Sequence, residues 1–292
     1  MLKAGYKAKP IKKIEVKENK TVASINRIPL SICYVPYENG LAKLGVSIFS
    51  FYKYHIGTIK FIVHEWTDAM QQWADRLQKF IPDFKYEFRE QSYAYWRDTG
   101  FPKWGNDWQC YLRFYVPYYF PNTIYLDCDT AFFRSADIIE LHKYQTDNII
   151  AAAARDASNG NFALDDNMPV NWIELEHQYV NSGVLVFGKR ARELLVKAKQ
   201  CKIQCRFGDQ SIINYVCSKN DIKLLPIHYN YWDKKQGDLT QDICIGHFVG
   251  STGKPFTTVN VPCRRLAAKH IKKHNYRQLA QEYKKEWNNA LH

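Results

Sequence analysis

The sequence lacks the long hydrophobic runs that membrane proteins require. Its 292 residues contain no stretch of roughly 18 apolar residues, so it predicts no membrane-spanning helix. The first twenty residues are basic and lack the apolar segment of about 7 to 15 residues that defines a secretory signal. We therefore expect a cytoplasmic protein, either free or held peripherally on the inner face of a membrane.

The sequence also lacks the paired cysteines of a disulfide framework. Its eight cysteines are scattered, several of them within apolar runs, which is typical of reduced and buried thiols. Cys201 and Cys205 are the one close pair, and neither a second pair nor a histidine follows nearby. This spacing is a weak signal for zinc. No internal repeat is found along the chain.

The body of the chain lacks net charge, although the whole sequence carries a net charge of +12. Residues 1–20 contribute +5 and residues 262–292 contribute +6, so residues 21–261 are close to neutral. This distribution argues against a basic groove in the main domain and indicates ends that meet an anionic partner.

The C-terminal end combines this charge with apolar residues at every fourth position. Three interpretations remain open: a helix packed on its own domain, an interfacial helix on an anionic membrane, or a contact with nucleic acid. The apolar positions are Leu279, Tyr283, Trp287 and Leu291.

Hydrophobic periodicity predicts strands that alternate with helices. Strands are expected at 30–35, 58–66, 83–90, 124–126, 148–156, 182–190, 222–231 and 243–250, and helices at 41–55, 68–81, 108–120, 191–201 and 209–218. Asp68 is the expected N-cap of the second helix. The alternation predicts an α/β fold, with a mainly parallel sheet flanked by helices. We expect a basic leader at 1–29, a catalytic domain at 30–261 and a basic helical tail at 262–292.

Two aspartates follow the buried strand at 124–126, where an isolated charge is costly unless it is paired. Side chains two residues apart in an extended segment point the same way, so Asp127 and Asp129 can reach one cation. Oxygen ligands suit Mg²⁺ or Mn²⁺, and a histidine as third ligand would favour Mn²⁺.

The motifs that follow have a recognisable order. They are YLDCDT, YVNSGVLVFGKR, FGDQSIIN, LLPIHYNYW and HFVGSTGKPF. In this order they resemble the family 8 retaining glycosyltransferases, which include glycogenin and the bacterial lipooligosaccharide galactosyltransferases. The resemblance covers about residues 30–258. It implies the nucleotide-sugar-binding, A-type glycosyltransferase fold.

The resemblance also implies roles for individual residues. Asp127, Asp129 and His247 would bind the metal. The donor would contact Val35, Pro36 and Tyr37 at the base, Asp127 and Cys128 at the ribose, Gly250 and Lys254 at the diphosphate, and Arg113. Asn181 and Ser182 would lie at the sugar together with the candidate catalytic residues Asp156, Asp209 and Gln210.

The implied function is a metal-dependent retaining hexosyltransferase. It would move a sugar from a nucleotide sugar, most simply a UDP-hexose, to a saccharide acceptor on a glycolipid or a protein. A divalent ion and Lys254 would neutralise the diphosphate as it leaves. Two alternatives are a DNA-modifying glycosyltransferase, suggested by the basic ends, and a nucleotide-sugar-binding protein without turnover.

Overall fold

The computed structural model describes residues 30–103, 107–133, 138–153, 179–201, 208–231, 243–248, 281–286 and 289. The strands are β1 (Leu30–Tyr34), β2 (Gly57–Val63), β3 (Lys85–Glu90), β4 (Ile124–Leu126), β5 (Thr130–Phe132), β6 (Ile150–Ala153), β7 (Val184–Phe187), β8 (Ile222–Leu225) and β9 (Ile245–His247). The α-helices are α1 (Leu41–Tyr54), α2 (Asp68–Phe80), α3 (Ala94–Asp98), α4 (Val116–Tyr119), α5 (Ile138–Leu141), α6 (Glu193–Gln200) and α7 (Asp209–Val216). Short 3₁₀ helices are η1 (Glu38–Gly40), η2 (Gln109–Tyr115), η3 (His142–Tyr144) and η5 (Ile227–Tyr229), and residues 281–286 are helical.

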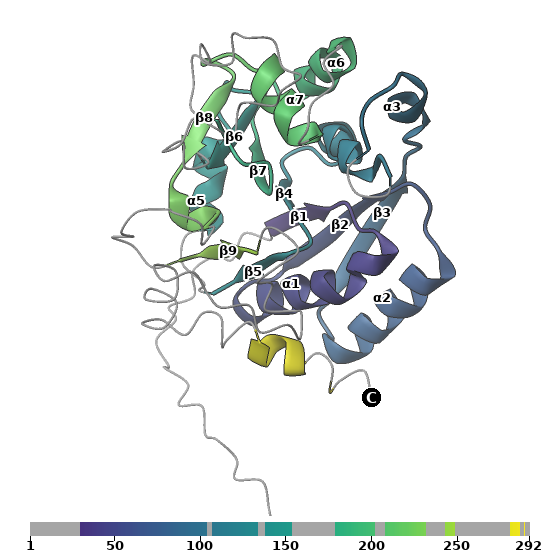
Figure 1. Ribbon diagram of the computed structural model, residues 1–292. Helices are drawn as coiled ribbons and strands as arrows, with labels where there is room; N and C mark the ends of the chain where they lie inside the picture. The colour runs from purple at the N-terminus through teal and green to yellow at the C-terminus, as the bar shows by residue number, and fades with distance from the viewer. Residues whose placement is uncertain are drawn as a thin grey trace, which may run out of the picture.

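Seven strands form the main sheet, in the order β3-β2-β1-β4-β7-β6-β8 (Figure 1). Strands β3, β2, β1 and β4 pair in parallel, as do β6 and β8. Strand β7 runs antiparallel to both of its neighbours, β4 and β6. The prediction of an α/β fold with a mainly parallel sheet is therefore confirmed.

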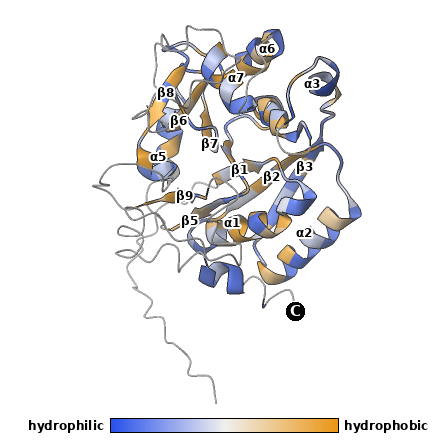
Figure 2. Cartoon of the chain, in the orientation of Figure 1, coloured by the Kyte–Doolittle hydropathy of each residue, from blue (hydrophilic) through white to orange (hydrophobic). Residues whose placement is uncertain are grey.

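Helices cover both faces of this sheet (Figures 1 and 2). The central strands β4, β7 and β6 are fully buried, whereas the edge strand β3 has no buried residue. Alternate residues of β1 enter different cores, because side chains of a strand point to opposite faces. Ile32 and Tyr34 pack with α1 and α2, whereas Cys33 packs with η2, α6 and α7. Within the described residues, the six cysteines are free thiols, as the scattered spacing predicts.

Three predicted elements end or begin at other residues than expected. Helix α2 is capped by Thr67, whose hydroxyl accepts a hydrogen bond from Met70 N, so Asp68 is its first helical residue. The helix expected at 108–120 is split into η2 and α4, since Pro117 has no N–H to donate to Arg113 O. Pro226 likewise ends β8, and the rest of that predicted strand turns through η5.

A second, two-stranded sheet is formed by β5 and β9, which run antiparallel. Thr130 is opposite His247 in this pairing, and Phe248 N donates to Asp129 O at 2.9 Å. The last predicted strand thus lies outside the main sheet. Its pairing brings His247, from near the end of the expected domain, next to the turn that follows β4.

Residues 281–286 pack against helix α1 (Figure 1). Tyr283 is 1% exposed, and its hydroxyl lies 2.9 Å from that of Tyr54. Lys53 Nζ lies over the rings of Phe49 and Tyr283, and it pairs with Glu286 at 2.9 Å. At Tyr283, the tail is therefore a helix packed on its own domain.

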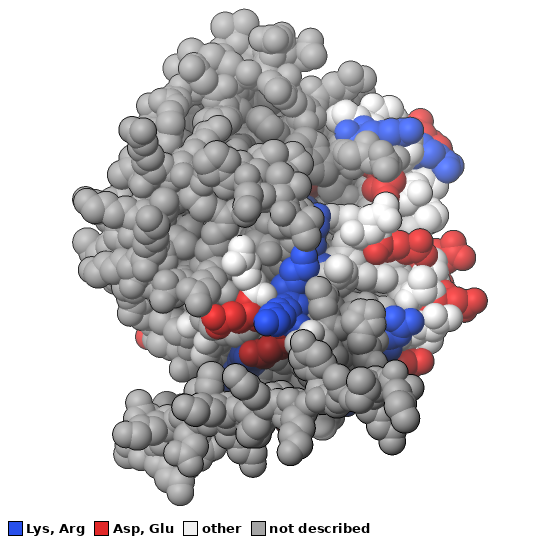
Figure 3. All heavy atoms as spheres, turned by 60° about the horizontal axis from the view of Figure 1, so that its bottom comes forward, with Lys and Arg blue, Asp and Glu red and all other residues white. Residues whose placement is uncertain are grey.

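The other three apolar positions of the tail, Leu279, Trp287 and Leu291, lie outside the described residues. On the face that contains 281–286, the described basic and acidic side chains are interspersed (Figure 3). Among the described residues, no helix has the length and apolar character needed to cross a bilayer. The domain boundaries and the membrane or nucleic-acid partners remain predictions.

The docking of the tail can be tested with Tyr283→Ala. Removing a buried aromatic side chain and leaving the Tyr54 hydroxyl unpartnered should lower the free energy of unfolding by about 3–5 kcal/mol. Denaturant titration of the full chain measures this loss. Lys285→Ala, at an exposed neighbouring position, is the control and should change stability by less than about 0.5 kcal/mol. Equal stability of the two variants would show that the tail is not docked in solution.

Candidate active site

The turn between β4 and β5 carries the two aspartates. Asp127 N donates to Gly183 O at 2.8 Å, which joins the turn to the segment before β7. At the other side, the Thr130 hydroxyl donates to Asp127 O at 2.9 Å and lies 3.0 Å from the Ser47 hydroxyl of α1. The turn with the two carboxylates is thus held by two elements, the segment before β7 and helix α1.

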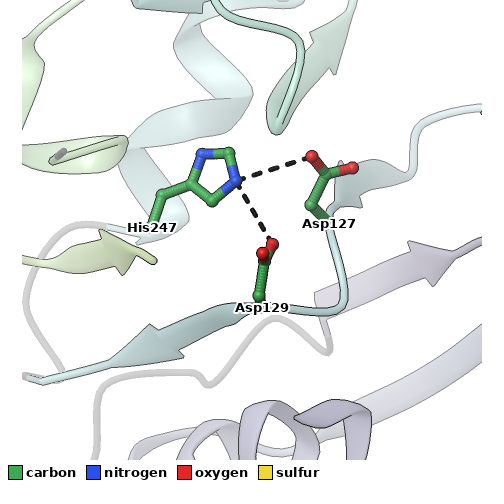
Figure 4. A group of neighbouring side chains, drawn as sticks. All are labelled: Asp127, Asp129 and His247. Atoms are coloured by element: carbon green, nitrogen blue, oxygen red, sulfur yellow. Dashed lines mark ion pairs between the residues drawn. The ribbon is translucent and has the colours of Figure 1, made fainter. Parts of the chain in front are cut away.

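His247 completes a group of three converging ligands (Figure 4). Its Nε2 lies 3.5 Å from Asp127 Oδ2 and 3.3 Å from Asp129 Oδ1. One ligand atom from each residue lies within 4.8 Å of the others. Two carboxylates and an imidazole form a donor set that suits a divalent ion such as Mn²⁺.

The protonation of His247 reflects its two anionic neighbours. Burial disfavours its cation, but the hydrogen bonds and charges of Asp127 and Asp129 outweigh burial and raise its pKa to about 9. Burial also opposes ionisation of Asp127, yet Arg113 and His247 lower its pKa below the ordinary value. Without a metal, the imidazolium provides the positive charge between the carboxylates.

Arg113 links the aspartate turn to helix α7. Its Nη2 lies 3.2 Å from Asp127 Oδ1, and its Nη1 lies 2.9 Å from Asp209 Oδ2. Nη1 also donates to Ser182 O and Oγ, at 3.0 and 2.8 Å. The guanidinium lies over the Tyr125 ring, 4.7 Å from its centroid. A single buried cation therefore holds two carboxylates from different elements.

Asp209 is the first residue of α7 and is 3% exposed. Gly208 before it has a φ of 53°, a conformation that glycine adopts without strain. Burial raises the pKa of Asp209 to about 6, against the opposing charge of Arg113. The carboxyl group is thus ionised at neutral pH and titrates close to it.

Amide side chains form the wall between Asp209 and His247. Gln210 Oε1 accepts from Asn181 Nδ2 at 2.9 Å and from Ser182 N at 3.2 Å. Gln210 Nε2 approaches the Tyr179 hydroxyl at 3.4 Å. All of these residues are buried. The sequence-predicted residues Asn181, Ser182, Asp209 and Gln210 are thus in one hydrogen-bonded group with Arg113.

The residues expected at the base of the donor lie at the end of β1. Cys128 Sγ donates to Val35 O at 3.6 Å, which places this segment beside the aspartate turn. Gln109 Nε2 donates to Pro36 O. Tyr37 is 39% exposed, so its ring is accessible to a ligand. Three further expected residues, Asp156, Gly250 and Lys254, lie outside the described residues.

Three residues with close contacts here were not predicted. The Tyr125 hydroxyl donates to Asp127 Oδ1 at 2.7 Å, and Asn230 Oδ1 lies 3.0 Å from His247 Nδ1. Gly183 faces the imidazole so closely that a Cβ there would lie 2.0 Å from His247 Cε1. The motifs YLDCDT, LLPIHYNYW and YVNSGVLVF contain them. The two-residue spacing of Tyr125 and Asp127 is compatible with their contact, whereas sequence spacing does not show the contacts of Asn230 and Gly183 with His247.

Comparison with known proteins agrees with this geometry. The fold is that of the A-type glycosyltransferases, and residues 65–258 match glycosyl transferase family 8. The chain belongs to this family and is a glycosyltransferase. No curated protein sequence matches it.

Several solved structures share the fold. The galactosyltransferase LgtC, in complex with donor and acceptor sugar analogs, has a TM-score of 0.60 at 16% identity, over 84% of this chain and 95% of that one. An active-site variant of LgtC has a TM-score of 0.62 at 16% identity, with the same coverage. GlyE of Streptococcus pneumoniae TIGR4, in its apo form, has a TM-score of 0.59 at 16% identity, over 90% of this chain and 62% of that one.

The contact between Gly183 and His247 predicts that substitutions at these two positions will have non-additive effects on the free energy of unfolding. Gly183→Ala should destabilise the protein by about 1–3 kcal/mol, since the added methyl group must displace the imidazole. In a His247→Ala background the same substitution should cost less, because the ring is absent. A double-mutant cycle of unfolding free energies measures this coupling. Additive effects would refute a direct contact.

The raised pKa of His247 predicts a pH dependence of stability in the presence of a chelator. Because the folded pKa of about 9 exceeds the ordinary value of 6.5, the imidazolium contacts stabilise the folded state fully below about pH 6.5. That contribution should decline as the pH rises and be lost above pH 9. The stability difference between wild type and His247→Gln measures it across this range. A difference that does not vary with pH would contradict the assignment.

Proposed function

We propose that the protein is a metal-dependent, retaining hexosyltransferase that uses a UDP-sugar donor and a saccharide acceptor. The observation that carries the proposal is the convergence of Asp127, Asp129 and His247 where β4 ends and β9 pairs with β5. Ligands of open α/β sheets bind outside the carboxyl ends of the strands. The acceptor class is supported by LgtC, whose structure was solved with donor and acceptor sugar analogs.

The three ligands would hold Mn²⁺ or Mg²⁺. A divalent ion bound there supplies positive charge against the diphosphate leaving group. Asp127, Asp129 and the neutral imidazole of His247 then act as its ligands, with Nε2 facing both carboxylates. The donor's base would lie against Val35, Pro36 and Tyr37, and its ribose beside Cys128. Gly250 and Lys254 complete the proposed diphosphate site.

Asp209 and Gln210 are the proposed catalytic groups at the sugar, with Asp156 as the third. The sugar becomes positively charged as the bond to the diphosphate breaks. An ionised Asp209, oriented by Arg113, would stabilise that charge either as a nucleophile or beside an ion pair. Gln210 Oε1 is already bound by two donors, so its position is fixed before substrate enters.

Removal of one ligand carboxylate tests the metal site. Asp129→Asn keeps the size of the side chain but removes a charged ligand, so Mn²⁺-dependent hydrolysis of a UDP-hexose should fall at least about 100-fold. The metal-free variant should still fold, with a somewhat lower melting temperature, because Asp129 is one of the two anions that stabilise the His247 imidazolium. Asp83→Asn, at an exposed position far from the site in sequence, is the control and should retain wild-type hydrolysis. Full wild-type activity in excess chelator would refute the metal role.

Nucleotide binding provides a separate test of the donor. UDP with Mn²⁺ should raise the melting temperature, by an amount that grows with UDP concentration, since a ligand of the native state alone stabilises it. Other nucleoside diphosphates at equal concentration are the comparison. If none of them shifts the melting temperature, the nucleotide-sugar proposal fails. If another diphosphate stabilises more than UDP does, the identity of the base is wrong.

A further inference from the structure

Asn230 lies beside the proposed metal site but provides none of its ligands. The residue is 2% exposed and follows η5, where the chain turns back toward β9. Tyr231 N donates to Ile245 O at 2.9 Å and His247 N donates to Tyr231 O at 2.8 Å. These backbone bonds on the neighbouring residue fix Asn230 next to the His247 ring. A buried amide in this position needs partners for both of its ends.

The hydrogen bonds of Asn230 define which end of its amide faces the histidine. Gly183 N donates to Asn181 Oδ1 at 2.9 Å, so this oxygen is an acceptor. Asn230 Nδ2 donates to the same oxygen at 2.9 Å. The Gly183 N–H thus sets the orientation of the Asn230 amide, through Asn181 Oδ1, which both groups contact. Its Oδ1 is consequently the atom that faces His247 Nδ1, at 3.0 Å.

An amide oxygen can only accept a hydrogen bond, so it requires a proton on His247 Nδ1. The other nitrogen, Nε2, is then the one that can offer a lone pair, and it points at Asp127 and Asp129. Gly183 packs against the same ring. The imidazole is thus positioned by a glycine and an amide, neither of which would touch the ion.

We infer that Asn230 is a positioning residue that makes His247 a metal ligand through Nε2 by holding the proton on Nδ1. The inference rests on the proposed metal site and extends it by one residue. Outer partners of ligand histidines fix the ring and its tautomer, and their loss commonly weakens metal binding 10- to 100-fold. The chain from Gly183 N through Asn181 and Asn230 also connects this ligand to Gln210, which shares Asn181.

The first experiment measures Mn²⁺ affinity by electron paramagnetic resonance, with the full chain at pH 8, with and without UDP. Asn230→Ala should bind Mn²⁺ about 10- to 100-fold more weakly than wild type. Asn230→Asp keeps an acceptor for Nδ1–H and should bind more tightly than Asn230→Ala. Asn148→Ala removes another buried asparagine, whose Oδ1 accepts from Thr146, and should bind as wild type does.

A second measurement does not depend on any Asn230 variant folding. In ¹⁵N-histidine spectra of the wild type with Mg²⁺ and UDP, the His247 signal, assigned by its loss in His247→Gln, should report a protonated Nδ1 and an Nε2 without a proton. A protonated Nε2 with bare Nδ1 would overturn the inference. So would Mn²⁺ affinity of folded Asn230→Ala within twofold of wild type. Failure of the wild type itself to bind Mn²⁺ would instead overturn the proposed metal site, and the inference with it.

Discussion

The arrangement of the site depends on the electrostatic cost of placing carboxylates at the end of a buried strand. Asp127 directly follows β4, whose three residues are all buried. Without compensation, a desolvated carboxylate would be protonated or would destabilise the fold. Arg113 and His247 supply the compensating positive charge. Arg113 comes from η2, shortly before β4, whereas His247 comes from β9, far along the chain. The charge requirement is therefore met partly by local structure and partly by long-range topology.

Two irregular features of the fold satisfy that constraint. Strand β7 runs against its neighbours, and the segment before it, from Tyr179 to Gly183, lies between α7 and the aspartate turn. Strand β9 lies outside the main sheet and pairs with β5, which places His247 opposite Thr130. A regular sheet of parallel strands would provide neither the amide wall nor the imidazole.

Local patterns in the sequence predicted the regular parts of this fold and several parts of the site. Apolar segments indicated β1 and β2, alternation indicated β3, and the Asp127–Asp129 spacing indicated a shared cation. The helix predicted at 108–120 is split because Pro117 lacks an N–H. The apolar pattern of this segment continues through the proline, so it did not indicate the split. Asn230 and Gly183 contact His247, whose position depends on the pairing of β9 with β5. No local sequence pattern encodes these contacts.

The charges of the described site support the proposal that it binds a divalent ion. Asp127, Asp129 and Asp209 are three carboxylates, whereas Arg113 and protonated His247 are two cations. Taken alone, these five side chains carry a net charge of −1. A divalent ion that displaced the Nε2 proton would add one net positive charge and bring these five side chains to neutrality.

Asp209 and Asp127 differ in the number of cations beside them. Asp209 has Arg113 as its one ion-pair partner among the described residues, and burial raises its pKa to about 6. Asp127 has two ion-pair partners, Arg113 and His247, and its pKa is lowered. Under the proposed function, this weaker compensation by cations favours an interaction of Asp209 with the positive charge that develops on the sugar.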